Sequence, residues 1–418
     1  MKNVCEAKTG YSLLVALILL GMAGCGSLSS PSTPGNTYST TSNKGDYSEW
    51  TFTDSALAVT WEVVNDTGGV DYTYDIAANC DSADANNIRR CTIDSAACTD
   101  GLVVCPTPLP SGEIDVMEVP GVALLVRTTA DNGGDQLHAG FVKSSSACAE
   151  NVSGDYTFIR TGVGLNELFG LFRVDSNMVD ILHADFGFDT PETSSAAYSS
   201  QTVAYRTGTE SETLADGGCS DGLRLRTNSA GETIRAMMTA SGLYVLDLPA
   251  GQGGALAFNV SNAASLSDFE NKSFAGYSFP DNAPPQAFNV TSGTIASDKV
   301  EMNASLAGGT SLDIMALTTP SGLTSPAYAD FTAVPAGYGS AVLASDYPTP
   351  KDIPGLFKIG RLTDKGRVLL AAMKFNDKII AMGMVYNFRD TADTNPSTGA
   401  AFVSPGLYNT GNFILFEK

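Results

Sequence analysis

Six cysteines in the body of the chain have the spacing that says most about chemistry. They are Cys80, Cys91, Cys98, Cys105, Cys148 and Cys219. No Cys-x-x-Cys pair occurs among them, which disfavours a zinc ribbon, a thioredoxin-type redox pair and covalent haem. An even number of cysteines in an exported chain predicts structural disulfides. The spacing leaves the pairing open, and the simplest expectation is local pairing: Cys80–Cys91, Cys98–Cys105 and Cys148–Cys219.

Candidate acid–base residues are few, because the chain has only 2 histidines. His138 follows an Asp- and Gly-rich stretch and is expected on a loop, whereas His183 is expected on a strand. Either histidine has carboxylates nearby, but a structural role is favoured because no activated nucleophile accompanies them. The nucleophile-elbow, dinucleotide and phosphate-loop patterns are absent. We therefore predict no catalytic residue.

Two loops share the pattern Asp-x-Ala-Asp-x-Asn, and carboxylate and amide oxygens on one loop suit Ca²⁺. Neither loop matches the EF-hand motif, and Asp and Asn are also common turn residues. The cofactor prediction is therefore none, with Ca²⁺ as the weaker alternative. The residues of this alternative site are Asp81, Asp84, Asn86, Asp390, Asp393 and Asn395.

Composition excludes one class of partner and supports a folded core. The 418 residues include 45 acidic and 24 basic side chains, which gives a net charge of −21. A chain with this charge repels phosphate backbones, so no nucleic-acid partner is expected. Hydrophobic residues make up 43% of the chain, which is enough to form a core.

The N-terminus carries a lipid-attachment pattern. Lys2 and Lys8 precede a short apolar run over residues 11–23. The end of this run and the two residues after it read Met22-Ala23-Gly24-Cys25. The run is shorter than the about 20 residues that span a bilayer, and it has the length of a signal-peptide core. The whole segment resembles the signal peptide and lipobox of a bacterial membrane lipoprotein precursor.

The resemblance implies that residues 1–24 are removed and that Cys25 becomes acylated, for example with palmitate. Gly26 follows Cys25 where an Asp would favour the inner membrane, which implies anchoring in the outer membrane, facing the periplasm or the surface. Several acyl chains on one residue anchor a protein stably, since each buried CH₂ contributes about 0.8 kcal/mol.

Ser, Thr, Pro, Gly and Asn dominate the segment after Cys25, so residues 25–48 are expected to form a disordered tether. Three β-domains are expected beyond it: a Cys-rich domain over residues 49–150 and two more over residues 151–265 and 266–418.

Alternation of apolar and polar residues recurs throughout the body and predicts strands. The clearest case is residues 380–388, with Ile380, Met382 and Met384 on the face expected to be buried. Asn376-Asp377 predicts a hairpin turn just before it. Strands are also expected at residues 57–64, 70–76, 122–128, 156–160, 243–248, 255–260 and 412–417. The predicted fold class is all-β, with two or three antiparallel sandwich- or barrel-like domains behind a flexible tether.

Together these features predict a lipid-anchored, non-enzymatic cell-envelope protein that binds another envelope or extracellular component. Two alternatives stay open from sequence: a carboxylate-based hydrolase of envelope or extracellular polymers, and a β-barrel that binds lipid or a small ligand in its interior.

Overall fold

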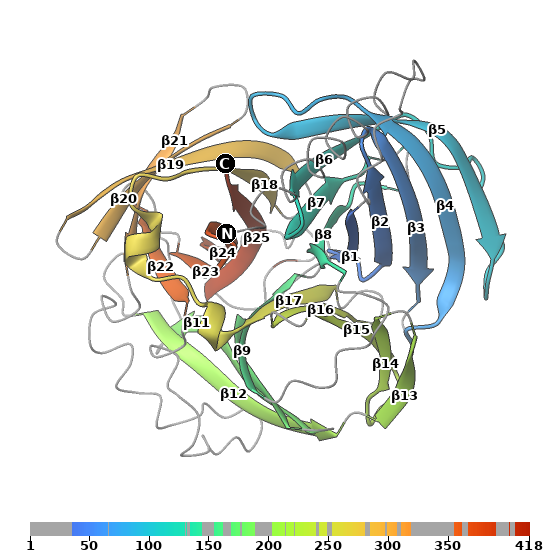
Figure 1. Cartoon of the computed structure of the whole chain (residues 1–418). Helices are drawn as coiled ribbons and strands as arrows, with labels where there is room; N and C mark the ends of the chain where they lie inside the picture. The colour runs from blue at the N-terminus through green and yellow to red at the C-terminus, as the bar shows by residue number, and fades with distance from the viewer. Residues whose placement is uncertain are drawn as a thin grey trace, which may run out of the picture. The chain divides into compact units, whose positions relative to one another are not determined.

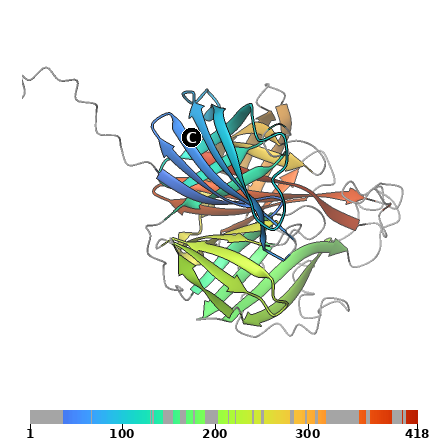
Figure 2. The ribbon, with the colours of Figure 1, turned by 90° about the vertical axis from the view of Figure 1, so that its right-hand side faces the viewer.

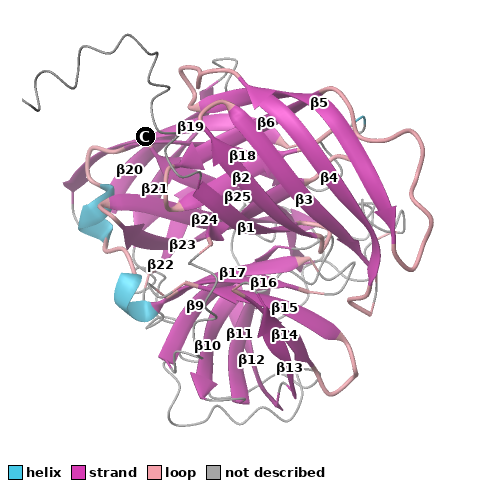
Figure 3. Ribbon diagram, turned by 45° about the vertical axis from the view of Figure 1, so that its right-hand side comes forward, coloured by secondary structure: helices cyan, strands magenta, loops and turns pink. Residues whose placement is uncertain are grey.

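The chain folds into three antiparallel sheets in a computed structural model (Figure 1). The structure describes residues 36–418 apart from short gaps and five longer stretches: 144–153, 162–168, 189–202, 319–354 and 390–405. Within the last stretch, residue 401 alone is described. Residues 36–418 form one compact unit. Figure 3 shows that most of the described chain is strand, which confirms the all-β prediction.

The first sheet, barrel 1, is closed. Its strands are β1 (Asn36–Ser42), β2 (Tyr47–Thr53), β3 (Ala56–Val64), β4 (Val70–Cys80), β5 (Ile88–Asp100), β6 (Glu113–Val119), β7 (Ala123–Arg127) and β8 (Leu137–Val142). They follow one another in sequence order, and β1 pairs with β8 to close the ring, so that Thr40 lies opposite Gly140. In Figures 1 and 2 these strands are drawn in blue to teal and curve around an interior.

The second sheet is open. Its strands are β9 (Gly154–Thr161), β10 (Phe169–Asp175), β11 (Met178–Phe188), β12 (Val203–Thr213), β13 (Ala215–Ser220), β14 (Leu223–Thr227), β15 (Thr233–Met238), β16 (Leu243–Asp247) and β17 (Gly254–Asn259). The first and last of them, β9 and β17, pair in the middle of the sheet.

The third sheet, barrel 2, is closed like the first. Two short 3₁₀ turns, η2 (Val260–Asn262) and η3 (Leu266–Phe269), precede it. Its strands are β18 (Ser273–Pro280), β19 (Gln286–Ala296), β20 (Lys299–Leu306), β21 (Ser311–Thr318), β22 (Leu356–Arg361), β23 (Arg367–Phe375), β24 (Lys378–Arg389) and β25 (Gly406–Glu417). The predicted turn between β23 and β24 is present, with Asn376 and Asp377 both at positive φ, as a type I′ turn requires.

Each barrel has its own buried interior, and a further hydrophobic cluster contains residues of all three sheets. The expectation of a half-buried strand at residues 380–388 is wrong over residues 380–384, whose burial the structure describes. In β24, Met382 belongs to the shared cluster, while its neighbour Ala381 faces the interior of barrel 2. Both faces of the strand are therefore covered over residues 380–384.

Residues 36–48 do not form part of the tether expected over residues 25–48. Strand β1 begins at Asn36, and its residues Ser39, Thr40, Thr41 and Ser42 are almost fully buried. The hydrogen-bond ladders to β2 and β8 satisfy its backbone, which a composition rule does not take into account. The other expected boundaries, at 150/151 and 265/266, fall between β8 and β9 and between β17 and β18.

Candidate functional site

A polar and aromatic cluster lies inside barrel 1, and it contains one of the two histidines of the chain. Alternate residues of a strand share a face, so Tyr38 and Thr40 of β1 point inward together with Ser48 and Trp50 of β2. Trp61 of β3 lies opposite Ser48 in the ladder. The remainder of the interior is apolar, with Leu57, Val59, Ile76, Ile114, Val116, Leu124 and Val126 among its residues.

His138 lies on β8, opposite Val126 and Ser42 in the two flanking ladders. The loop expected at this position is therefore wrong, because the turn residues end at Asp135 and β8 begins at Leu137. The imidazole is fully buried. It makes edge-to-face contacts with Trp61, at 4.7 Å between ring centroids, and with Trp50, at 5.6 Å.

Hydroxyl groups on the neighbouring strands β1 and β2 form a hydrogen-bonded group with His138. Its Nδ1 atom lies 2.9 Å from Ser48 Oγ, which also accepts a 2.8 Å hydrogen bond from Trp50 Nε1. Thr40 Oγ1 lies 2.7 Å from the same Ser48 oxygen. Among the described residues, His138 Nε2 has no hydrogen-bond partner. The imidazole ring is thus held by one hydrogen bond at Nδ1 and by edge-to-face contacts with two indole rings.

This surrounding keeps His138 neutral. Burial, together with the positive charge of Lys44, lowers the pKa of the imidazole to about 3. Protonation would bury a charge away from water and make both ring nitrogens donors, although Nε2 has no acceptor among the described residues. A general base must exchange protons with a substrate, so the arrangement suits a structural role better than acid–base catalysis.

Two buried carboxyl groups lie near one end of β1. Asp46, in the turn after β1, accepts hydrogen bonds from Gln136 Nε2 (3.0 Å) and from the backbone of Val64 (3.2 Å). Asp247 of β16 accepts a 2.8 Å hydrogen bond from Thr41 and is also buried. Burial raises the pKa of both carboxyl groups above the usual range of aspartate.

Asp247→Asn should raise the free energy of unfolding at pH 8 by on the order of 1 kcal/mol, because burying the charged carboxylate is costly. The amide can still accept from Thr41 but carries no charge to desolvate. A raised folded-state pKa means that aspartate contributes most below its unfolded value of about 3.9 and destabilises as pH rises through the folded pKa. The gain of the variant should therefore grow with pH in urea unfolding curves. A gain that is equal at pH 5 and pH 8 would contradict this explanation.

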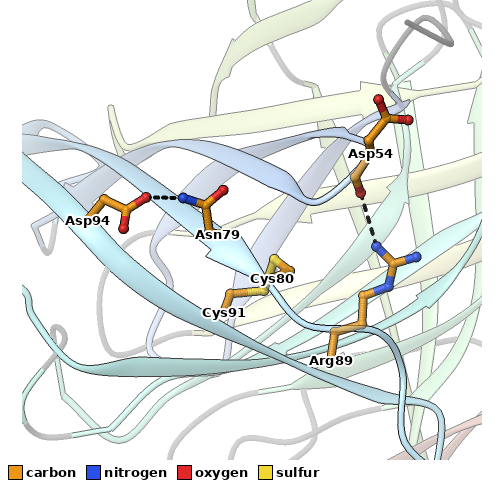
Figure 4. Close-up of a disulfide and its surroundings, with 6 residues drawn as sticks. All are labelled: Asp54, Asn79, Cys80, Arg89, Cys91 and Asp94. Carbon is orange, nitrogen blue, oxygen red and sulfur yellow. Dashed lines mark hydrogen bonds between the residues drawn. A yellow bond between two sulfur atoms is a disulfide. The ribbon is translucent and has the colours of Figure 1, made fainter. Parts of the chain in front are cut away.

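Two of the predicted disulfides are confirmed, Cys80–Cys91 and Cys98–Cys105. Figure 4 shows the first, which joins directly opposed residues of β4 and β5, with an Asn79–Asp94 hydrogen bond between the same two strands. Cys219 is disulfide-bonded. Cys148 lies outside the described residues, so the pairing Cys148–Cys219 stays a prediction.

The first Asp-x-Ala-Asp-x-Asn loop is a hydrogen-bonded turn. Asp84 Oδ1 accepts from the backbone of Asn86 (2.7 Å) and Ile88 (3.0 Å), and Asn86 Oδ1 accepts from Asn289 (2.8 Å). Asp81 is exposed. Within the described ranges no group of three His, Cys, Asp or Glu side chains has the geometry of a metal site. Asp390, Asp393 and Asn395 lie outside them.

Cys25 and the predicted signal peptide also lie outside the described residues, which begin at Asn36. His183 is on β11 as expected. No helix in the part of the chain that the structure describes has the length and hydrophobicity needed to cross a membrane.

One surface feature was not anticipated from the sequence, namely exposed aliphatic side chains in the loop between β5 and β6. Leu102, Val103, Val104 and Leu109 are exposed by 70%, 50%, 75% and 37%. The signal was present as the run Leu-Val-Val directly before Cys105, between turn residues on either side.

Comparisons with known proteins do not assign a function. Neither a family model nor a curated protein matches the chain. Among solved structures, the chain is similar to a protein with unknown function from the DUF3598 family of Nostoc punctiforme. That alignment covers 92% of this chain and 94% of the other, with 11% sequence identity and a TM-score of 0.21. We draw nothing about function from a similarity this low.

Proposed function

We propose that this protein is a lipid-anchored, non-enzymatic component of the bacterial cell envelope that binds another envelope or extracellular component. The observation that carries the proposal is the pattern Met22-Ala23-Gly24-Cys25 directly after a short apolar run. Acyl chains on Cys25 would hold the protein at the outer membrane, with the residues after Cys25 linking the anchor to β1.

The folded body supports an exported, non-catalytic protein in two ways. Its two resolved disulfides fit an oxidising compartment such as the periplasm or the cell surface. His138 and Asp247, two groups with strongly shifted pKa values, are both buried. Binding through the outer surface therefore agrees with the geometry better than acid–base chemistry does.

The interiors of the barrels also bear on the alternative of a ligand-binding barrel. Large side chains fill the described interior of barrel 1, where Tyr38, Trp50 and Trp61 are fully buried. In barrel 2 the corresponding residues include Phe269, Phe274 and Phe357. The interior of an eight-stranded barrel is just wide enough either to be filled by side chains or to hold one small ligand. Interiors filled by large side chains therefore favour a surface-binding role.

Cys25→Ala tests the anchor in a Gram-negative host, with Cys5→Ala as the matched control because Cys5 lies within the segment expected to be removed. We expect the wild-type chain and Cys5→Ala to sediment with the membranes and to incorporate labelled palmitate. Cys25→Ala should lose both properties, because one residue carries all the acyl chains. A Cys25→Ala chain that matures normally and remains in the membrane fraction without fatty acid would refute the proposal.

A further inference from the structure

The exposed loop between β5 and β6 has the properties of a docking site. Burying a Leu or Val side chain is favourable, and a monomer usually leaves such residues exposed singly rather than in a group. Here four of the five large hydrophobic residues that are exposed in the described chain lie within residues 102–109, which we name the apolar loop. The fifth, Leu225, lies on β14.

The apolar loop is held in place by bonds at its base. The Cys98–Cys105 disulfide closes it, and Cys105 N donates to the Asp100 carboxylate at 2.8 Å. The backbone of Leu102 donates to Val70 O (3.1 Å), and that of Val103 donates to Asp71 O (3.0 Å). A loop ordered in this way loses little conformational entropy when it binds, which favours affinity.

Charge around the apolar loop indicates the chemistry of its partner. The segment from residue 91 to residue 119 contains no Lys or Arg, and the neighbouring strand β4 contains none either. Asp75, Asp94 and Asp100 are exposed on these strands. A partner with an apolar pocket rimmed by basic residues would complement this surface. A second copy of the chain would bring acid against acid, because its net charge is −21.

The apolar loop lies at the end of barrel 1 that is opposite to the start of β1. Leu102 is bonded to Val70, at the end of barrel 1 where Val64 pairs with Val70. Asn36, where β1 begins, lies at the opposite end of the barrel. Asn36 pairs with Phe52, Phe52 with Leu57, and Leu57 with Ala78, which is close to the end of β4 that is far from Val70. The exposed carboxylates on β4 and β5 would be repelled by anionic lipid headgroups, which favours a protein with basic residues as the occupant.

We propose that the apolar loop, residues 102–109, docks on an envelope or extracellular protein whose surface offers an apolar pocket rimmed by Lys or Arg. The inference rests on the proposed function, since it needs a chain displayed outside the cytoplasm. It goes further by assigning the contact residues and the chemical class of the partner.

A photoreactive amino acid at position 104 of the full anchored chain tests the inference in cells, with position 225 as the matched exposed control. We expect a covalent adduct with another protein from position 104 and none from position 225.

The crosslinked protein is then purified, and its binding to the mature chain is measured by calorimetry. Leu102→Ser combined with Val104→Ser should weaken binding at least about 10-fold, and Leu225→Ser should leave it unchanged. Raising the salt concentration to about 0.5 M should weaken the wild-type complex through screening.

Four outcomes would overturn the inference: no adduct at position 104, an adduct only between copies of the chain, purified binding that ignores the double substitution, or binding that does not respond to salt. Vesicles of phosphatidylethanolamine and phosphatidylglycerol supply the lipid arm of the test. If the Cys25→Ala chain bound them through Leu102 and Val104, the occupant would be a membrane. The fractionation of Cys25→Ala is independent of these measurements, so failure of the anchor and failure of the docking site are distinguishable.

Discussion

Lowering the pH from about 7.5 to about 4.5 should cost the protein about 2–3 kcal/mol of unfolding free energy through His138 alone. Its pKa is about 3 in the folded chain and about 6.5 when unfolded. The folded state therefore binds fewer protons in this pH range. The stability that His138 contributes is complete above about pH 6.5 and is lost as pH falls toward the folded value.

The measurement is a set of urea unfolding curves across this pH range, followed by tryptophan fluorescence. The chain has 2 tryptophans, and both contact the His138 ring, so the signal reports on this part of barrel 1. Because other groups titrate as well, the informative quantity is the difference between wild type and His138→Gln. That difference should change by about 1.4 kcal/mol per pH unit below pH 6. Parallel behaviour of His138→Gln would contradict the assignment.

Gly140→Ala should destabilise the protein by about 3 kcal/mol or more, although glycine to alanine in a strand ordinarily stabilises. Gly140 lies on β8 at the closure of barrel 1, opposite Thr40. A Cβ at this position would overlap the backbone carbonyl oxygen of Ser39. Gly276 holds the same place at the closure of barrel 2, where a Cβ would overlap the carbonyl oxygen of Ile414. Backbone atoms cannot move aside as a flexible side chain can, so the ladder must open.

Chemical denaturation of Gly140→Ala and Gly276→Ala checks this explanation, with Gly293→Ala as the control. At Gly293 the nearest atom to an added Cβ is Glu301 O at 3.9 Å, which leaves room for a methyl group. We expect both closure variants to unfold at lower denaturant concentration and the control to be unchanged. Tryptophan fluorescence follows barrel 1, and circular dichroism follows all three sheets. If the two closure variants were as stable as the control, close contact between the first and last strands would not be what requires glycine there.

Local features of the fold were predictable from the sequence because their causes lie within a few residues. Alternation over residues 57–64 and 70–76 predicts β3 and β4, and Asn376-Asp377 predicts the turn that follows β23. The two confirmed disulfides join cysteines close in sequence, where the loop to be closed is short. Such features depend on backbone propensity and short-range geometry, which a sequence displays directly.

Features that depend on distant contacts were not predictable in the same way. Strand β1 has the composition of a linker, yet its Ser and Thr side chains are buried because β8, about a hundred residues later in the chain, closes the barrel against it. His138 follows turn residues, so its place on a strand and its contact with Ser48 depend on that same closure. The covered faces of β24 depend on packing against other sheets. In each case long-range burial overrides local composition.

The central claim, a lipid anchor at Cys25, is tested most directly by the mass of the N-terminal peptide from the mature protein, extracted from membranes in detergent. The account predicts a peptide that begins at Cys25 and is heavier than its sequence by the mass of several fatty acyl chains, with nothing from residues 1–24 attached. A mature N-terminus at any other residue, or an unmodified Cys25 at the mature N-terminus, would contradict it.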